Sequence, residues 1–109
     1  MNVDNKLIAE FMELLEISNE TYPILYKDKN SDEWFAPDEL KYHTDWNWLM
    51  EVVEKIESLN FIVYIETNYC QLYNATNHEE LIKSIYSTKI ESVYKACVEF
   101  VKWYNEQPK

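Results

Sequence analysis

Three small clusters in this sequence contain residue types that carry out chemistry in proteins, and the first is His43-Thr44-Asp45. A histidine and an aspartate could act together as a general acid–base pair. Side chains this close in sequence seldom converge on one reacting atom, whereas Thr-Asp ahead of a helical pattern is typical of an N-cap. We therefore expect Thr44 or Asp45 to be the capping residue, with the acid–base pair as the alternative.

The second cluster, His78-Glu79-Glu80, offers imidazole and carboxylate groups of the kind that bind metal ions. Consecutive residues point in different directions, and no further group of His or Cys completes a set of four ligands. A solvated loop is the preferred interpretation. We predict no metal site and no cofactor.

The third candidate is Cys97, which could be a nucleophile next to His43 or His78. It lies on the apolar stripe of a predicted helix, whereas nucleophilic cysteines need an electropositive and partly open setting. We predict that Cys97 and Cys70 are reduced thiols that pack as small hydrophobic side chains. A disulfide or a redox role is the alternative.

The composition removes several other kinds of site. The chain has no glycine, which excludes the Gly-rich phosphate loop, the dinucleotide fingerprint and the nucleophile elbow. It has no arginine, which excludes bidentate recognition of phosphate or guanine. Since no catalytic cluster is left, we expect no catalytic residues and a protein that is not an enzyme.

The charge is strongly negative and unevenly distributed. The net charge is −10, and residues 1–60 carry 14 acidic residues against 5 lysines. Such a surface repels phosphate backbones, so nucleic-acid binding is disfavoured. The same surface suits a basic partner protein.

The acidic side chains also form a pattern, because glutamates recur every three residues on two predicted helices. A solvated helical face explains this spacing, and a docking surface for a basic partner is the alternative. Trp46 and Trp48 lie just before the glutamates of the second predicted helix. Because they are two positions apart on that helix, at most one of them faces the core squarely. The candidate interaction surface consists of Glu10, Glu13, Glu16, Trp46, Trp48, Glu51, Glu54 and Glu57.

The aromatic content exceeds what a core of this size needs, with nine tyrosines and four tryptophans. These residues either lie partly buried at the rim of the domain or form a surface for self-association or a partner. An aromatic-lined cleft that binds a nucleotide or another small ligand is a further alternative. Lys27, Lys29 and Lys41 lie in the aromatic-rich segment 21–48 and could contact the phosphate of such a ligand.

The length of 109 residues fits a single domain, residues 1–109. No stretch approaches 18 consecutive apolar residues, so we expect no membrane span. The start MNVDNK lacks the basic residues and apolar core of a signal peptide. We therefore expect a soluble, cytoplasmic protein.

Apolar residues at three- and four-residue spacing predict three helices, at residues 4–16, 44–60 and 88–105. The predicted N-caps, in chain order, are Asp4, Thr44 or Asp45, and Thr88. Thr88 and Glu91 fit a capping box. Asn60 is expected to end the second helix in a left-handed conformation.

The β-branched and aromatic stretch at residues 61–66 predicts a central strand, and residues 69–73 should return beside it as a hairpin. Shorter strands are predicted at residues 21–27 and 39–43. Pro23 should place the first of these at the edge of a sheet. Residues 79–86 fit either a short helical turn or an irregular crossing. Three main helices packed on a small antiparallel sheet make an α+β fold, with an α/β/α sandwich-like arrangement.

Two stretches together resemble a known family. Tyr42-His43-Thr44-Asp45-Trp46 leads into a helix that contains Val52-Val53-Glu54-Lys55, and residues 89–104 form the second stretch. They resemble the phage ABA sandwich domain family of small phage and prophage proteins. The resemblance rests on the helical pattern of these two stretches. It implies an α/β/α sandwich and no particular activity.

These observations favour a non-enzymatic phage or prophage accessory protein that acts by binding. The expected partner is a host protein, such as a defence component, bound through an acidic aromatic surface. Homo-oligomerisation is also expected. The alternative is a small-ligand or nucleotide-binding protein with an aromatic-lined pocket.

Overall fold

The computed structural model describes residues 3–18, 24–28 and 30–108. In this part of the chain there are three α-helices, one short 3-10 helix and two antiparallel sheets, so the expected α+β class is confirmed. The helices are α1 (Val3–Phe11), η1 (Pro37–Glu39), α2 (Trp46–Ser58) and α3 (Lys89–Asn105). The strands are β1 (Leu15–Ile17), β2 (Leu25–Lys27), β3 (Phe61–Ile65), β4 (Tyr69–Asn74) and β5 (Glu80–Ile85).

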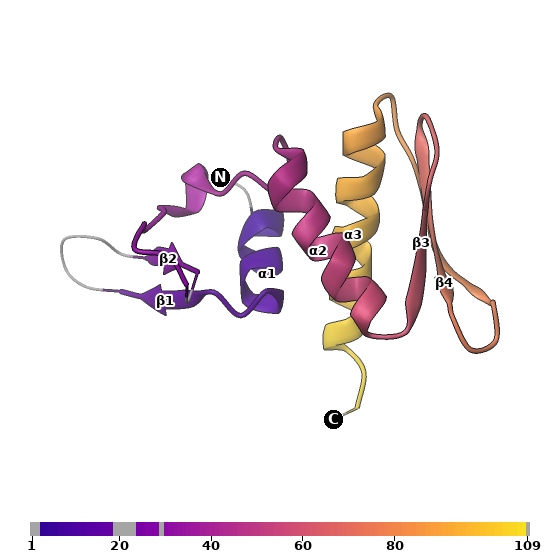
Figure 1. Cartoon of the computed structure of the whole chain (residues 1–109), viewed down its shortest axis with the longest axis horizontal. Helices are drawn as coiled ribbons and strands as arrows, with labels where there is room; N and C mark the ends of the chain where they lie inside the picture. Colours follow the sequence, from indigo (N-terminus) through magenta and orange to yellow (C-terminus); the bar gives the residue numbers. More distant parts are fainter. Residues whose placement is uncertain (1–2, 19–23, 29, 109) are drawn as a thin grey trace.

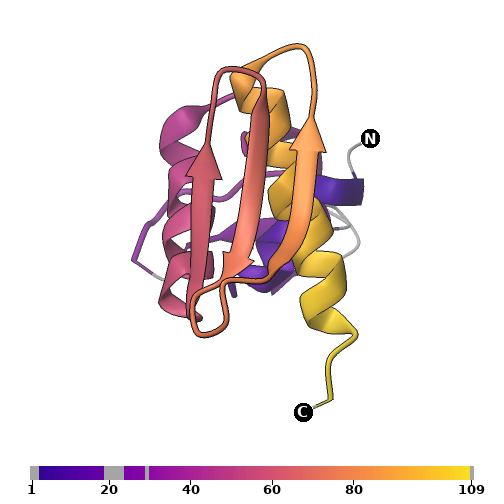
Figure 2. The same cartoon turned by 90° about the vertical axis from the view of Figure 1, so that its right-hand side faces the viewer.

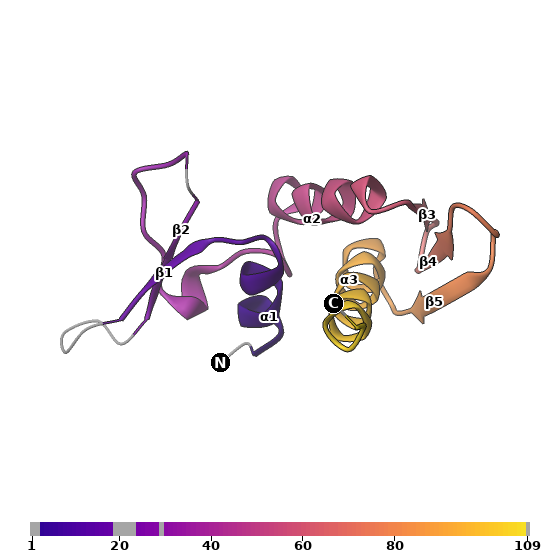
Figure 3. The same cartoon turned by 90° about the horizontal axis from the view of Figure 1, so that it is seen from below.

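The elements form successive layers along the longest axis of the molecule (Figure 1). The sheet β3-β4-β5 lies at one end, and α2 and α3 cover one of its faces. Helix α1 packs against α3, and the small sheet β1-β2 lies beyond α1 (Figure 3). All three α-helices therefore lie on the same side of the three-stranded sheet.

The core lies between the three-stranded sheet and the helices. Helix α2 contributes one apolar stripe, and α3 contributes a wider one because it lies between the sheet and α1. Burying each such side chain stabilises the fold by about 1.5–3 kcal/mol. The buried residues of α2 and α3 include Leu49, Val52, Val53, Ile56, Val93, Cys97, Val98, Phe100 and Val101.

The opposite face of the three-stranded sheet is open (Figure 2). Side chains alternate along a strand, so paired residues share a face. The inner face carries Cys70 and Leu72, which are fully buried. The outer face carries exposed Ile62, Tyr64 and Ile85, and no other element of the described chain covers them.

The best-predicted elements are those with local cap signals. Asp45 caps α2, since its Oδ1 accepts a hydrogen bond from the backbone N–H of Asn47 at 2.8 Å. Thr88 caps α3, since its Oγ1 accepts from the N–H of Glu91 at 3.2 Å. Asn60 follows α2 with φ 75°, the left-handed conformation that the sequence predicted. The hairpin of β3 and β4 is also confirmed.

The first helix is shorter than predicted. It ends at Phe11, and Glu13 then adopts φ 60°, a left-handed conformation that takes the chain out of the helix. Leu15–Ile17 pairs with Leu25–Lys27 as the sheet β1-β2, so the prediction of helix up to residue 16 is wrong. Asp4 lies in the first helical turn, not at the N-cap. Long-range strand pairing overrides the helical periodicity of Leu14 and its neighbours.

Predictions for four segments outside the helices also need correction. Residues 39–43 form the end of η1 and a turn, not a strand. Residues 80–85 form β5, which neither alternative for that segment included. Because β5 pairs with β4, the central strand is β4, and β3 lies at the edge. The predicted strand at 21–27 is found at 25–27, and residues 21–23 lie outside the described residues.

Candidate functional site

The residues suggested as an acid–base pair have separate structural roles. Asp45 caps α2, as described above. His43 Nδ1 lies 2.8 Å from Nδ2 of Asn5, and its ring lies against Tyr94 with centroids 6.0 Å apart. The capping interpretation is confirmed with Asp45 as the N-cap, and Thr44 lies in the turn before it.

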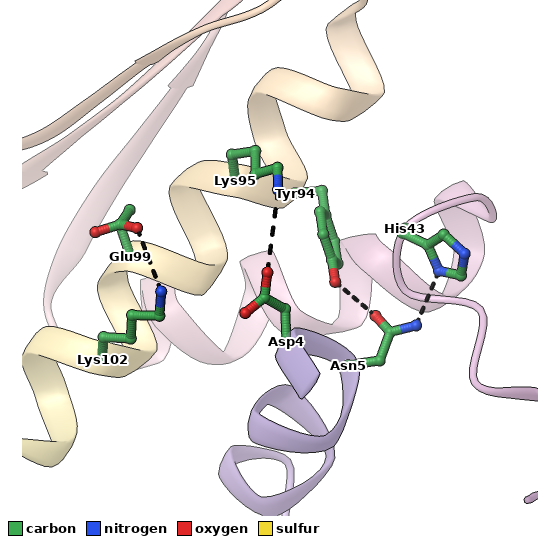
Figure 4. Close-up of polar contacts among 7 residues, drawn as sticks. All are labelled: Asp4, Asn5, His43, Tyr94, Lys95, Glu99 and Lys102. Atoms are coloured by element: carbon green, nitrogen blue, oxygen red, sulfur yellow. Dashed lines mark hydrogen bonds and ion pairs between the residues drawn. The ribbon is translucent and has the colours of Figure 1, made fainter. Parts of the chain in front are cut away.

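Asn5 is the centre of a polar network that joins three elements (Figure 4). It is buried in α1, and its Nδ2 donates to the carbonyl of Leu40 at 3.0 Å as well as facing His43. Its Oδ1 accepts from the hydroxyl of Tyr94 on α3 at 2.9 Å. One asparagine therefore fixes α1, α3 and the turn that leads into α2, a role that sequence patterns did not indicate.

Cys70 and Cys97 are free and buried, as the preferred interpretation expected. Burial raises the pKa of the Cys70 thiol to about 12. Burial, together with the neighbouring Cys70, raises the pKa of Cys97 above its ordinary value. Both thiols therefore stay protonated at neutral pH, which removes the nucleophilic thiolate.

His78 lies at the bend ahead of β5, with φ 60°. The neighbouring Glu80 accepts a hydrogen bond from Gln71 on β4, with Oε1 2.6 Å from Nε2. Among the described residues, no three His, Cys, Asp or Glu side chains gather closely enough to hold a metal ion.

The two sets of candidate glutamates differ in arrangement. Glu51, Glu54 and Glu57 are all exposed on α2. Glu10, Glu13 and Glu16 are exposed as well, but they lie respectively on α1, in the following turn and on β1. The sequence prediction that Glu10, Glu13 and Glu16 share one helical face is therefore wrong.

A lysine lies at the junction of the two glutamate sets. Lys55 Nζ forms an ion pair with Glu13 at 3.6 Å, donates to the carbonyl of Phe11 and lies 4.6 Å from the centroid of the Phe11 ring. This lysine attaches the end of α1 to α2. It also neutralises part of the acidic surface at that point.

The two candidate tryptophans point in different directions, as their spacing predicted. Trp46 is exposed. Trp48 is half-buried between two other rings, with its centroid 5.0 Å from Phe35 and 5.1 Å from Tyr42. Both ring pairs are edge-to-face, at 83° and 79°. Such pairs add about 0.5–1.5 kcal/mol each beyond burial.

These three rings form the wall of a hollow of about 450 Å³ that opens to solvent. We call it the acidic aromatic groove, and its lining residues are Leu14, Asp28, Asn30, Ser31, Phe35, Tyr42, Asn47, Trp48 and Glu51. They come from the turn after α1, the segment between β2 and η1, the turn before α2, and α2 itself. A smaller hollow of about 180 Å³ adjoins it, shares three of these residues and adds Glu13.

Backbone hydrogen bonds hold the walls of the groove in place. Phe35 exchanges two hydrogen bonds of 2.8 Å with Tyr26 of β2. Tyr42 lies in the turn whose Leu40 carbonyl binds Asn5. Asp28 accepts from the N–H of Asn30 at 2.8 Å, which orders the rim. Sequence reasoning identified Trp48 and Glu51 but missed these partners, although the aromatic pair at 34–35 within a polar segment was a signal.

The electrostatics of the groove are negative. Burial raises the pKa of Tyr42, and the carboxylates of Glu51 and Asp28 raise it further. The described lining residues include two carboxylates and no lysine. Lys27 lies over the ring of Trp34, 5.5 Å from its centroid, and Lys41 lines a different hollow. The predicted role of Lys29 lies outside the described residues.

Comparisons with family models, with curated proteins and with solved structures found no significant match. Among the described residues, no helix combines the length and apolar character that a membrane span requires.

Proposed function

We propose that this chain is a non-enzymatic binding protein that receives a basic partner protein at the acidic aromatic groove. The observation that carries the proposal is the groove itself, in which Asp28 and Glu51 flank three aromatic rings. Aromatic side chains supply contact area at interfaces, and the carboxylates select a positively charged partner. The net charge of −10 adds long-range attraction for such a partner and repels nucleic acid.

We further propose that the protein is a phage or prophage accessory protein and that its partner is a cytoplasmic host protein. The resemblance of residues 42–57 and 89–104 to the phage ABA sandwich domain family supports this proposal. A role in occupying the basic site of a host defence component fits the acidic groove. No catalytic step is assigned.

A direct titration tests the binding proposal. A short basic peptide should change the fluorescence of the tryptophans, and the affinity should fall as salt is added. Glu51→Lys should weaken binding about tenfold, because one attraction is lost and one repulsion is added, each about 0.7 kcal/mol for exposed charges. Equal affinity for an acidic peptide, or no effect of Glu51→Lys, would reject the proposal.

Glu106→Lys provides the matched control. Glu106 is exposed at the end of α3. Its substitution by lysine changes the net charge of the protein by the same amount as Glu51→Lys. If the groove is the site, Glu106→Lys should leave the affinity nearly unchanged. Equal weakening by both variants would mean that only the overall charge matters.

A small-ligand function is the second candidate, and the size of the groove favours it. A volume of about 450 Å³ lies within the range of ligand pockets, about 300–1,000 Å³. The two carboxylates oppose the phosphate of a nucleotide, so nucleotide sequestration is less favoured than binding of a cation. A thermal-shift screen with nucleotides, including cyclic ones, decides this point, because a concentration-dependent rise would support nucleotide binding.

Self-association is a separate proposal, and the open face of the three-stranded sheet is the surface that we assign to it. Exposed Ile62, Tyr64 and Ile85 form an apolar patch there. Lys83 partly offsets the carboxylates of Glu66 and Glu80 on this face, so two acidic copies repel each other less here than across the groove. Light scattering should give a mass above 13.2 kDa that Ile62→Lys lowers, and 13.2 kDa at every concentration would contradict the proposal.

A further inference from the structure

We propose that the acidic aromatic groove is a receptor for a single guanidinium group, so that the partner is recognised by one inserted arginine side chain. The proposal rests on the proposed function and names the group that occupies the site. It follows from three properties of the groove: the arrangement of its rings, the position of its carboxylates and the nature of its other polar groups.

The rings form a wall against which a flat cation can lie. Trp48 is roughly perpendicular to both Phe35 and Tyr42, at centroid distances near 5 Å. Within the described chain, the nearby lysine Lys27 lies on Trp34, and none of the residues lining the groove is a cation. Cations bind over aromatic faces, with tryptophan the best of them, and a guanidinium can also stack because it is planar.

The carboxylates are placed to pair with such a cation. Asp28 approaches from the segment after β2 and Glu51 from α2, and both raise the pKa of Tyr42, which shows that their charge reaches the ring wall. Both residues are exposed and make no ion pair within the described chain. A guanidinium can bind a carboxylate with two parallel hydrogen bonds.

The remaining polar groups distinguish guanidinium from other cations. Asn30, Ser31 and Asn47 line the groove and offer side-chain oxygens as acceptors. A guanidinium has five N–H donors in a fixed plane, whereas an ammonium has three and a quaternary ammonium has none. Only a donor-rich cation can satisfy several acceptors while it lies against the rings.

Calorimetric titration with blocked amino acids tests the proposal without a natural partner. N-acetyl-arginine methylamide should bind about tenfold more tightly than its uncharged isostere N-acetyl-citrulline methylamide, since charged hydrogen bonds are about twice as strong as neutral ones. The lysine analogue should bind more weakly than arginine, and choline most weakly. Equal binding of arginine and citrulline, or stronger binding of lysine or choline, would overturn the guanidinium assignment.

Two variants locate the site. Glu51→Gln leaves the exposed side chain nearly the same size and should reduce arginine binding severalfold, while Glu106→Gln should not. Trp48→Leu should also reduce it, with thermal unfolding as the check that the fold persists. Unchanged arginine binding in Glu51→Gln would place the cation elsewhere and overturn the proposal.

The basic-peptide titration separates this proposal from the proposed function. If a peptide with lysine in place of every arginine binds equally well and still depends on Glu51, the acidic docking surface is supported and the guanidinium assignment is rejected. If neither peptide binds, both proposals fail.

Discussion

The polar network around Asn5 should determine how firmly the N-terminal helix is attached, and Asn5→Ala tests this. Among the described residues, the substitution removes two buried hydrogen bonds, to the carbonyl of Leu40 at 3.0 Å and from the hydroxyl of Tyr94 at 2.9 Å. Each such bond contributes about 1–1.5 kcal/mol net. His43 is exposed and can bind water instead, so we assign no cost to that contact.

The expected loss in the free energy of unfolding is about 2–3 kcal/mol, a large part of the 5–15 kcal/mol typical of a domain. Urea unfolding followed by circular dichroism measures it directly. The melting temperature should fall by roughly 8–12 °C, at about 4 °C per kcal/mol for a domain of this size. Glu10→Ala, an exposed change on the same helix, should stay within about 0.5 kcal/mol of the wild type.

A double-mutant cycle shows whether the network acts as a unit. Tyr94→Phe removes only the hydroxyl, and combining it with Asn5→Ala should cost about 1 kcal/mol less than the sum of the single changes. Strict additivity, or a loss below about 1 kcal/mol for Asn5→Ala, would refute the reasoning. Because Tyr42 lies in the turn held by this network, Asn5→Ala should also weaken binding at the groove.

Three further predictions concern stability. The native state keeps the protons of Cys70 and Cys97 above pH 9, where unfolded thiols lose theirs, so the free energy of unfolding should fall with rising pH. Between about pH 8 and about pH 10 the two thiols should lower the free energy of unfolding by about 2–3 kcal/mol. Cys70→Ala should roughly halve this decrease in urea titrations at the two pH values. Asn60→Ala should cost about 1–2 kcal/mol because of the φ of 75°, whereas Asn60→Gly should be much milder; equal losses in thermal unfolding would contradict this. Thr88→Ala should cost about 1 kcal/mol through loss of the cap and Thr88→Ser a few tenths at most, an order that guanidinium unfolding can check.

The elements predicted correctly from the sequence are those with signals inside a short window. Helix α2 has Asp45 at its start and Asn60 at its end, and α3 has Thr88, so each boundary depends on atoms within a few residues. The hairpin of β3 and β4 likewise depends on a short turn between two β-rich stretches. Local hydrogen bonds and backbone preferences are sufficient to determine these elements.

The elements that were predicted wrongly depend on distant partners. Leu15–Ile17 becomes a strand because Leu25–Lys27 pairs with it, and Glu80–Ile85 becomes a strand because β4 is beside it. Neither segment has a decisive pattern of its own. The pairing of β5 with β4 also moves β3 from the centre to the edge of the sheet, which the composition of β3 did not indicate.

The candidate site shows the same division. The sequence alone determined the acidic charge and the absence of glycine and arginine, and it identified Trp48 and Glu51 as candidate interaction residues. Only the tertiary structure placed Phe35, Tyr42 and Asp28 around them, since these residues come from separate segments that meet through long-range packing. The sequence specifies which residue types are present. The groove that they line forms only when Asn5, β2 and α2 hold its lining segments in place relative to one another.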